Sequence, residues 1–511
     1  MKNKSNLAAK IICGSFALGV LGDAVLRESP LGLNAPLWSA AVILLILLLE
    51  RWQSIRIKGD PVWLAVAFLY AAAFAWRDSS VLKCLDALAL FTSVSFLFLP
   101  ESAVARLATC FECGASVVSC AINAAFGALP LMLTDLDLSN TPRQQWLRPA
   151  MAVGRGLLIA APLMLLFGAL FASADAVFDG IVKSIFSFNV PDLIIHSLII
   201  ALIAFIAAGF IRGLLLGRLV DFKHRDRAAS MSIGTQQFEF DDASRAPANL
   251  IGIVEVTTAL GLLDMLFLVF VVVQLRYLFG GRRLVEATSG LSYSVYAREG
   301  FFELVAVTAL VLPLLLVADW LLRRDTNINL RVFRMLGAAL LMMLFVVIAS
   351  ALDRMRTYQG EYGQTELRLY TTAFMFWLAA VSIWLGVTVL RGKRERFAFG
   401  AVVSGLAMVL ILNALNPDAL IVRTNTAFAR QGRHFDAVYL TSLSADAVPA
   451  LIEAFPSLNE TDRRTASRWV LGNWFPPQRE GWRSWSLARH DAWRATGKAR
   501  DQLSRSAVGP E

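Results

Sequence analysis

The stretch LSYSVYAREGFFELVAVTALVLPLLLVADWLLRR, residues 291–324, has the layout of a helix that crosses a lipid bilayer. It opens with two tyrosines and an Arg-Glu pair, continues with about twenty mostly apolar residues, and stops at a double arginine. Aromatic and basic residues commonly mark the ends of such helices because they hold them in the headgroup layers. The stretch therefore predicts a membrane span rather than a helix of a soluble core.

The composition extends this prediction to most of the chain. Hydrophobic residues make up 57% of the 511 residues, only 17% are charged, and the mean hydropathy is +0.59. The net charge of +9 would suit nucleic acid, but the basic residues lie at the ends of apolar runs, where they set membrane orientation. We predict an all-α, polytopic helical membrane protein whose partner is the lipid bilayer, with no nucleic-acid partner.

Cysteine and histidine give no sign of a metal or cofactor. Cys110 and Cys113 have the spacing of a redox or metal pair, but no histidine lies nearby and no second pair completes a zinc site. The four histidines are scattered along the chain. We predict no metal and no cofactor, and interpret the cysteines as small packing residues.

Apolar runs predict about eleven crossings. They lie at 7–26, 35–49, 61–76, 81–99, 152–172, 193–217, 251–275, 300–322, 331–352, 369–390 and 397–413. The more polar segment 103–136 could also span. However, the basic loops at 50–60 and 134–150 should both face the cytoplasm, so the number of crossings between them must be even. This parity favours an interfacial or re-entrant segment at 103–136.

The same charge rule gives the domain plan and the orientation. Residues 1–150 form an N-terminal membrane region, 151–413 a core transmembrane bundle, and 414–511 an extramembrane helical tail. With the arginine-rich loops inside, the N-terminus is cytoplasmic and the tail lies outside. The tail predicts a small helical hairpin that begins near Ser444, with Asn459 as a helix cap, and a disordered segment over the last ten residues.

Ionisable residues inside predicted spans are the first candidates for function. If the spans of Asp264 and Glu303 are antiparallel neighbours, both acids fall in the outer half of the membrane, where arginines at the same face could pair with them. Salt bridges within the bundle are the structural alternative. Lys83 and Asp86, one helical turn apart, are expected to neutralise each other.

The stretch DRMRTYQGEYGQTELR, residues 353–368, predicts a compact polar loop at the outer face. Its glycines permit a tight backbone and its tyrosines anchor it at the interface. With the acids above it defines one candidate polar site, for which no catalytic residue is assigned. Its members are Asp264, Tyr293, Tyr296, Arg298, Glu303, Arg354, Arg356, Tyr358, Glu361, Tyr362, Glu366 and Arg368.

Several motifs together resemble a bacterial polytopic membrane family. They are YAREGFFELVAVTALVLPLLL (296–316), YGQTELRLY (362–370), ALNPDALIVRTN (414–425), FDAVYLTSLSADAVPAL (435–451) and WRSWSLAR (482–489). The family is catalogued as domain of unknown function number four-one-seven-three, and the resemblance covers roughly residues 150–490. It implies a multi-pass protein of the bacterial inner membrane and supplies no catalytic residues. Members are sometimes labelled sensor kinases, but this chain has no Gly-rich nucleotide box and no P-loop.

Three functions remain open. A carrier of a small solute would use the candidate polar site as its path and should have a water-accessible cavity that reaches Asp264. A membrane-embedded enzyme would act on a lipid or lipid-linked substrate, with Glu303 or Glu361 as base. A non-catalytic sensor or assembly scaffold would bind a protein partner through its tail. We rank the scaffold and the carrier level and the enzyme behind them, because no residue spacing demands catalysis.

Overall fold

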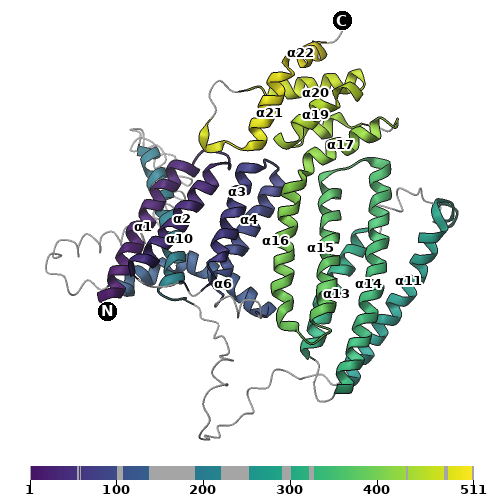
Figure 1. Ribbon diagram of the computed structural model, residues 1–511, viewed down its shortest axis with the longest axis horizontal. Helices are drawn as coiled ribbons and strands as arrows, with labels where there is room; N and C mark the ends of the chain where they lie inside the picture. Colours follow the sequence, from purple (N-terminus) through teal and green to yellow (C-terminus); the bar gives the residue numbers. More distant parts are fainter. Residues whose placement is uncertain are drawn as a thin grey trace, which may run out of the picture.

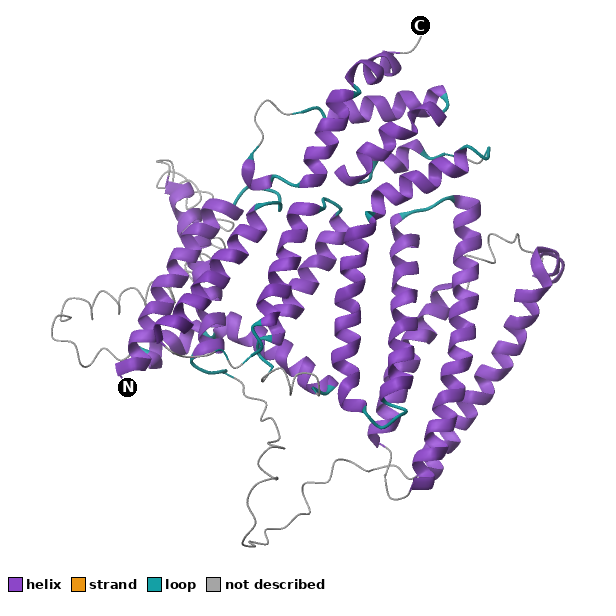
Figure 2. Cartoon of the chain, viewed as in Figure 1, coloured by secondary structure: helices purple, strands orange, loops and turns teal. Residues whose placement is uncertain are grey.

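The computed structural model describes residues 2–53, 57, 59–99, 108–136, 190–219, 253–289, 301–321, 327–432, 435–476 and 481–508. Every regular element in these ranges is a helix (Figure 2). The long helices stand side by side as a bundle, and the C-terminal helices form a separate layer over one end of it (Figure 1). The predicted polytopic helical fold with a small helical tail domain is confirmed.

The bundle helices follow the predicted apolar runs. They are α1 (Lys2–Leu26), α2 (Asn34–Gln53), α3 (Val62–Trp76), α4 (Ser80–Phe96), α6 (Cys110–Phe126), α7 (Ala128–Pro130), the π-helical turn η1 (Leu131–Asp135), α10 (Val190–Leu215), α11 (Ile253–Ser289), α13 (Phe301–Leu321), α14 (Asn327–Tyr362), α15 (Glu366–Thr388), the 3-10 turn η3 (Arg394–Arg396) and α16 (Phe397–Leu415). By length and composition, 8 of the described helices can cross a membrane, or up to 9 if one bent pair is counted as a span. Two helices at predicted crossings, α3 and α4, are not among the 8, because they are shorter, with 15 and 17 residues. The predicted crossing at 152–172 lies outside the described residues.

The bent pair is the segment predicted to be interfacial or re-entrant. Helix α6 and the following Ala128–Asp135 are inclined to each other by 46°. Thr109 and Glu112 form a capping box that fixes the start of α6. At the other end, Asp135 pairs with Lys4 Nζ (2.8 Å) and Arg212 Nε (2.7 Å). The segment therefore lies where α1 begins and α10 ends, at the end of the bundle away from the tail domain (Figure 1).

Two groups of helices form the bundle core. One hydrophobic cluster joins α1, α2, α3, α4, α6 and α10, and a second joins α11, α13, α14 and α15. Helix α16 contributes to both, with Ala398 in the first cluster and Phe397 in the second. Close packing of α1 on α10 depends on Gly19, because an added Cβ would lie 2.5 Å from the Ile200 carbonyl oxygen.

The tail domain is built from short helices. They are α17 (Pro417–Ala429), α18 (Ala437–Thr441), the 3-10 turn η4 (Ala445–Ala447), α19 (Val448–Ala454), the 3-10 turn η5 (Phe455–Ser457), α20 (Glu460–Asn473), the 3-10 turn η6 (Trp482–Ser484), α21 (Leu487–Lys498) and α22 (Arg500–Val508). Ser444 and Asn459 cap helices as predicted. The expectation of disorder at the end of the chain is wrong up to Val508, because Leu503 is fully buried in the tail core and holds α22 in place.

The tail core continues into the bundle. Its hydrophobic cluster includes Leu82 of α4, Leu369 of α15 and Leu412 of α16. These residues lie in the terminal turns of their helices. The corresponding helix ends face the tail domain (Figure 1). Continuous apolar packing thus makes the tail a fixed layer on the bundle.

Candidate functional site

The predicted polar site is assembled only in part. Tyr293, Tyr296 and Arg298 lie outside the described residues. Asp264 belongs to α11 and Glu303 to the first turn of α13, and both helices pack principally against α14, which lies between them (Figure 1). The condition that these two helices are direct neighbours is therefore not met in the described residues, where each packs on α14 instead.

Arg354 has a structural partner on α11. Its Nη2 donates to Gln274 Oε1 (3.1 Å), which also accepts from Ser350 Oγ (2.8 Å). Gln274 and Ser350 are both buried, so this contact fastens α11 to α14. In contrast, the side chains of Glu303, Arg356 and Glu361 are exposed.

Asp264 is half-buried in the middle of Glu255–Gln274, the apolar part of α11. Both carboxylate oxygens are enclosed, and neither has a hydrogen-bond partner among the described residues. Among the predicted site residues in the described part of the chain, Asp264 is the one with buried side-chain oxygens that accept no hydrogen bond.

Tyr358, Tyr362 and Arg368 do come together, around the end of α14. The Arg368 guanidinium lies 4.1 Å from the centroid of the Tyr358 ring, and the two tyrosines meet edge to face at 5.1 Å. Arg368 Nη1 also donates to the Tyr362 (3.0 Å) and Gly363 (2.5 Å) carbonyl oxygens. Because the last carbonyls of a helix lack partners within it, Arg368 serves as the C-terminal cap of α14.

The stretch 353–368 is mostly helix, so its prediction as a loop is wrong. Helix α14 runs to Tyr362 and α15 begins at Glu366, which leaves a turn of three residues with Gly363 at φ 77°. This turn docks on the tail. Gln364 exchanges two hydrogen bonds with Asn425, at 2.6 and 2.9 Å, and the Glu366 amide donates to the Tyr439 hydroxyl (2.8 Å).

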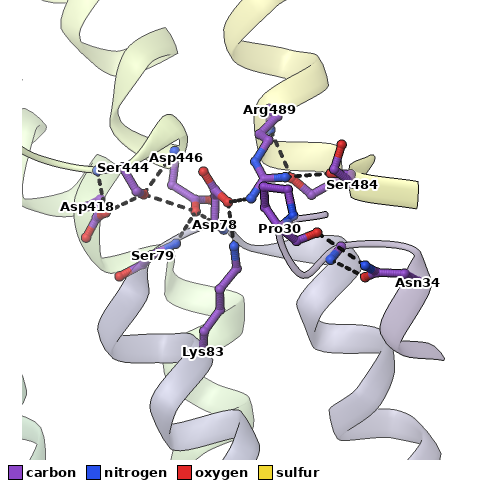
Figure 3. Close-up of polar contacts among 12 residues, drawn as sticks. Pro30, Asn34, Asp78, Ser79, Lys83, Asp418, Ser444, Asp446, Ser484 and Arg489 are labelled. Atoms are coloured by element: carbon purple, nitrogen blue, oxygen red, sulfur yellow. Dashed lines mark hydrogen bonds and ion pairs between the residues drawn. The ribbon is translucent and has the colours of Figure 1, made fainter. Parts of the chain in front are cut away.

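The densest polar contacts of the described residues lie elsewhere, where the turn between α3 and α4 meets the tail. We call this set the junction cluster (Figure 3). Its members are Arg77, Asp78, Ser79, Lys83, Asp446 and Arg489.

Asp446 is the centre of the junction cluster on the tail side. Its Oδ1 accepts from Arg77 Nη1 (3.1 Å), and its Oδ2 accepts from the backbone amides of Asp78 (2.6 Å) and Ser79 (3.2 Å). Ser79 is the N-cap residue of α4, and its own side chain makes no capping bond. A carboxylate is favourable at a helix N-terminus because the first amides are unpaired and the helix dipole is positive there. The tail thus caps a helix of the bundle.

Asp78 is the centre on the bundle side. Its Oδ1 accepts from Lys83 Nζ (2.6 Å) and from Arg489 Nη2 (2.5 Å) of α21, and Arg489 Nη1 donates to the Ser484 carbonyl oxygen (2.6 Å). The side chains of Asp78, Lys83 and Arg489 are between 11% and 17% exposed, so the pairs are shielded from solvent. Two carboxylates and three cations therefore satisfy one another across the junction.

A polar chain leads from the junction cluster into the bundle. Arg77 Nε donates to the Asn413 carbonyl oxygen (2.7 Å), and Asn413 Nδ2 donates to Asp86 Oδ1 (2.8 Å). The expected neutralisation of Asp86 by Lys83 is wrong. Asp86 lies on the buried face of α4 toward α16, whereas Lys83 reaches back to Asp78 in the preceding turn.

Burial raises the pKa values of several ionisable groups in the tail. Burial raises the pKa of Asp418 to about 6, and the hydroxyl and amide of Ser444, which donate to its Oδ2, offset part of this shift. Burial also raises the pKa of Asp446, while the Asp78 amide and Arg77 act in the opposite direction. Burial likewise raises the pKa of the Tyr439 hydroxyl.

The junction cluster was missed because its halves are far apart in the sequence. The only local signal is Arg77-Asp-Ser-Ser80, a short polar break between two apolar runs, and Asp446 lies 369 residues beyond Arg77. Nothing in one sequence pairs such distant residues.

The arrangement positions helices and offers no open reactive group. Every charged side chain of the junction cluster has a partner within it. No group of histidine, cysteine, aspartate and glutamate in the described ranges could hold a metal ion.

Comparison with known proteins gives one family. The model described as "Domain of unknown function (DUF4153)" matches residues 64–454, from α3 to the end of α19. No curated protein and no solved structure matches the chain. The resemblance seen in the motifs is thus confirmed, with the family number corrected to 4153 from four-one-seven-three. The match covers most of the chain, and the protein belongs to the DUF4153 family.

Proposed function

We propose that the protein is a non-catalytic membrane sensor or assembly scaffold in which the tail domain and the bundle move as one unit. The observation that carries this proposal is the cap that Asp446 of the tail places on helix α4 of the bundle. A partner bound to the tail would thereby act directly on a helix of the bundle.

The charges of the junction favour this role over catalysis. Removing one partner of a buried ion pair costs about 3–5 kcal/mol, because the other charge is left buried alone. Charged side chains that are held this firmly are suited to fixing the orientation of the tail relative to the bundle. A substrate-binding site would instead need cations or carboxylates that are free to meet a ligand.

We place the protein in the bacterial inner membrane with the tail on the periplasmic side. Support comes from the arginine-rich turn at residues 391–396, which lies at the end of the bundle away from the tail (Figure 1). Positive charge of this kind is typical of cytoplasmic loops. The N-terminus lies at the same end as this turn (Figure 1).

Asp264 supports a second candidate, the carrier. A carboxyl group without hydrogen-bond partners inside a membrane helix is costly and often marks a path for ions or solutes. If Asp264→Cys reacts with a water-soluble thiol reagent in a cysteine-free background, a water path reaches this position. The carrier function would then replace the scaffold function as the proposal.

The enzyme is less supported. A groove of about 640 Å³ lies between α4, α15 and α16, but its lining is almost entirely apolar. Tyr370 and Thr92 are the polar residues in it, and neither is a carboxyl group that could serve as a base.

Hydrogen exchange of the full-length protein in lipid nanodiscs tests the proposal. In Asp446→Asn, amide exchange should rise both in the tail around 437–454 and in the first turns of α4, because α4 loses its charged cap. Glu453→Gln is the matched control. Glu453 is 68% exposed and lies 3.9 Å from Arg423, and such a surface pair contributes about 0–1 kcal/mol.

The control should leave exchange in both segments unchanged. If Asp446→Asn loosens the tail while α4 keeps its wild-type exchange, the two parts are not coupled and the proposal fails.

A further inference from the structure

Asp86 is a fully buried carboxyl group with very few hydrogen-bond donors. It lies near the middle of α4 and is 0% exposed. Asn413 Nδ2 is the donor to its Oδ1, at 2.8 Å, and its Oδ2 has no partner in the described part of the chain. An ionised carboxylate offers about four acceptor positions, so most of its capacity is unused here.

The orientation of Asn413 confirms that the site is short of donors. Its Nδ2 donates to both Asp86 Oδ1 and the Val409 carbonyl oxygen (3.0 Å), so both amide hydrogens are used. A flipped amide would direct an oxygen at these two acceptors. Asn413 Oδ1 is consequently left buried without a donor among the described residues, next to an acid in the same condition.

The charged and titratable groups around Asp86 are otherwise engaged. On its own helix Lys83 is held by Asp78, and beyond the end of α3 Arg77 is held by Asn413 and Asp446. From α3, Tyr70 faces Asp86 and donates its hydroxyl to the Leu406 carbonyl oxygen (2.6 Å).

The remaining elements packed on α4 bring no cation to Asp86. Helix α16 contributes Asn413, which is uncharged. From α6, Cys120 lies beside Ser95, about two and a half turns farther along α4 than Asp86. The acidic Glu112 of α6 is bonded to its own N-cap residue, Thr109.

The two protonation states of Asp86 differ greatly in free energy. A buried charge without a cation or sufficient hydrogen bonds is strongly unfavourable. A neutral carboxyl group leaves only one O–H unpaired, which costs much less. The neutral form of Asp86 is therefore favoured. We propose that Asp86, held by Asn413, is a proton-binding site of the bundle, and that its proton occupancy is relayed to the tail through Asn413 and Arg77.

The relay follows hydrogen bonds that already exist. Asn413 joins Asp86 to Arg77, and Arg77 joins Asn413 to Asp446. Loss of the proton from Asp86 places a negative charge beside the Asn413 side chain, and a shift of Asn413 is passed to Arg77, which donates to the Asn413 backbone carbonyl oxygen. A displaced Arg77 in turn weakens its bond to Asp446, which ties the tail to the α3–α4 turn. This step rests on the proposed function and names the proton as the stimulus that the sensor reads.

Infrared spectroscopy of the full-length protein in lipid tests the proton site. The carbonyl band of a protonated carboxyl group should be present at neutral pH and should be lost in Asp86→Asn, which preserves the shape of the side chain. Asp60→Asn is the control, because Asp60 is only half-buried and its Oδ1 accepts from the Val62 amide in the usual way. The control should keep the band.

Two outcomes overturn the proton site. The site is not protonated if Asp86→Asn leaves the band intact. A sodium ion is the ligand instead if the wild-type band appears only after sodium is replaced by choline.

The relay is tested separately by titration. In the wild type, the rise in pH that removes the Asp86 band should also speed amide exchange around 437–454, and Asp86→Asn should abolish this response. If the band titrates while exchange in the tail stays constant in both proteins, the proton site stands. That outcome would contradict the relay, and with it the proposal that the protein senses protons.

Discussion

At the scale of single residues, Asp418 shows how burial without a full set of partners controls an acid. It is 1% exposed, its Oδ2 accepts two hydrogen bonds from Ser444, and its Oδ1 has no partner in the described part of the chain. The charged form is therefore poorly stabilised, which is why burial raises the pKa to about 6.

This pKa shift predicts a pH dependence of tail stability. Because the pKa is higher in the folded state than the value of about 3.9 in the unfolded chain, Asp418 favours folding at low pH. The stabilisation is complete below about pH 4, is lost as the pH rises through about 6, and changes no further above that. The rise of this pKa from about 4 to about 6 corresponds to about 3 kcal/mol.

The comparison of wild type with Asp418→Asn isolates this contribution from that of other carboxyls. The free energy of tail opening, from hydrogen exchange, should fall between pH 4 and pH 7 by about 3 kcal/mol less in the variant than in the wild type. Equal pH profiles for the two proteins would contradict the prediction.

At the scale of elements, Asn416 connects the last bundle helix to the tail. It ends α16 in the left-handed region, with φ 51° and ψ 78°, and its side chain accepts from the Ala419 amide (3.2 Å) to cap α17. Asparagine tolerates this conformation better than most residues and is also a strong N-cap. One residue thus stops one helix and starts the next.

Substitution of Asn416 should separate these two roles. Asn416→Ala loses the cap, about 1 kcal/mol, and adds about 1–2 kcal/mol of backbone strain, whereas Asn416→Gly should lose less than about 1 kcal/mol. The opening free energy of α17, measured by hydrogen exchange, gives both values. Gly432→Ala reports strain alone, because Gly432 has φ 77° and nothing within 4 Å of an added Cβ. Equal losses for the alanine and glycine variants of Asn416 would exclude the strain.

At the scale of the whole molecule, distant turns meet the tail at one end of the bundle. The turn before α2 is held by a hydrogen bond from the Leu33 amide to the Trp485 carbonyl oxygen (2.8 Å), the turn before α4 by Asp446, and the turn before α15 by Asn425. The distribution of positive charge among the loops predicts the same arrangement, with these turns and the tail on one side of the membrane.

Accessibility of single cysteines in a cysteine-free background checks this arrangement. Leu31, between α1 and α2, and Ser442, directly after α18, are exposed and belong to segments at the tail end of the bundle. Lys393 is exposed in the turn between α15 and α16, at the opposite end (Figure 1). A membrane-impermeant thiol reagent applied to intact cells should label Leu31→Cys and Ser442→Cys, and Lys393→Cys only after the cells are permeabilised. Labelling of Lys393→Cys alone would reverse the orientation and leave the fold unchanged. Labelling of only one of the other two would contradict the fold.

The sequence by itself determined the membrane class and the positions of the helices. Apolar run length and the charges beside each run are local properties, so α13 follows the apolar run within residues 291–324. Helix caps are equally local, which is why the capping roles of Ser444 and Asn459 could be predicted from the neighbouring residues alone. The division of the membrane part at residue 150 remains a prediction.

Only the tertiary structure decided which polar groups meet. Lys83 had two carboxylates within reach, and the burial of Asp86 against α16 left Asp78 as its partner. Arg368 became a helix cap because α14 and α15 form a tight hairpin. Asp446 found the amides at the start of α4 because the tail packs over that end of the bundle. The length of an apolar run is a property of one segment of the sequence. Ion pairing between segments depends instead on how the packed helices are placed relative to one another.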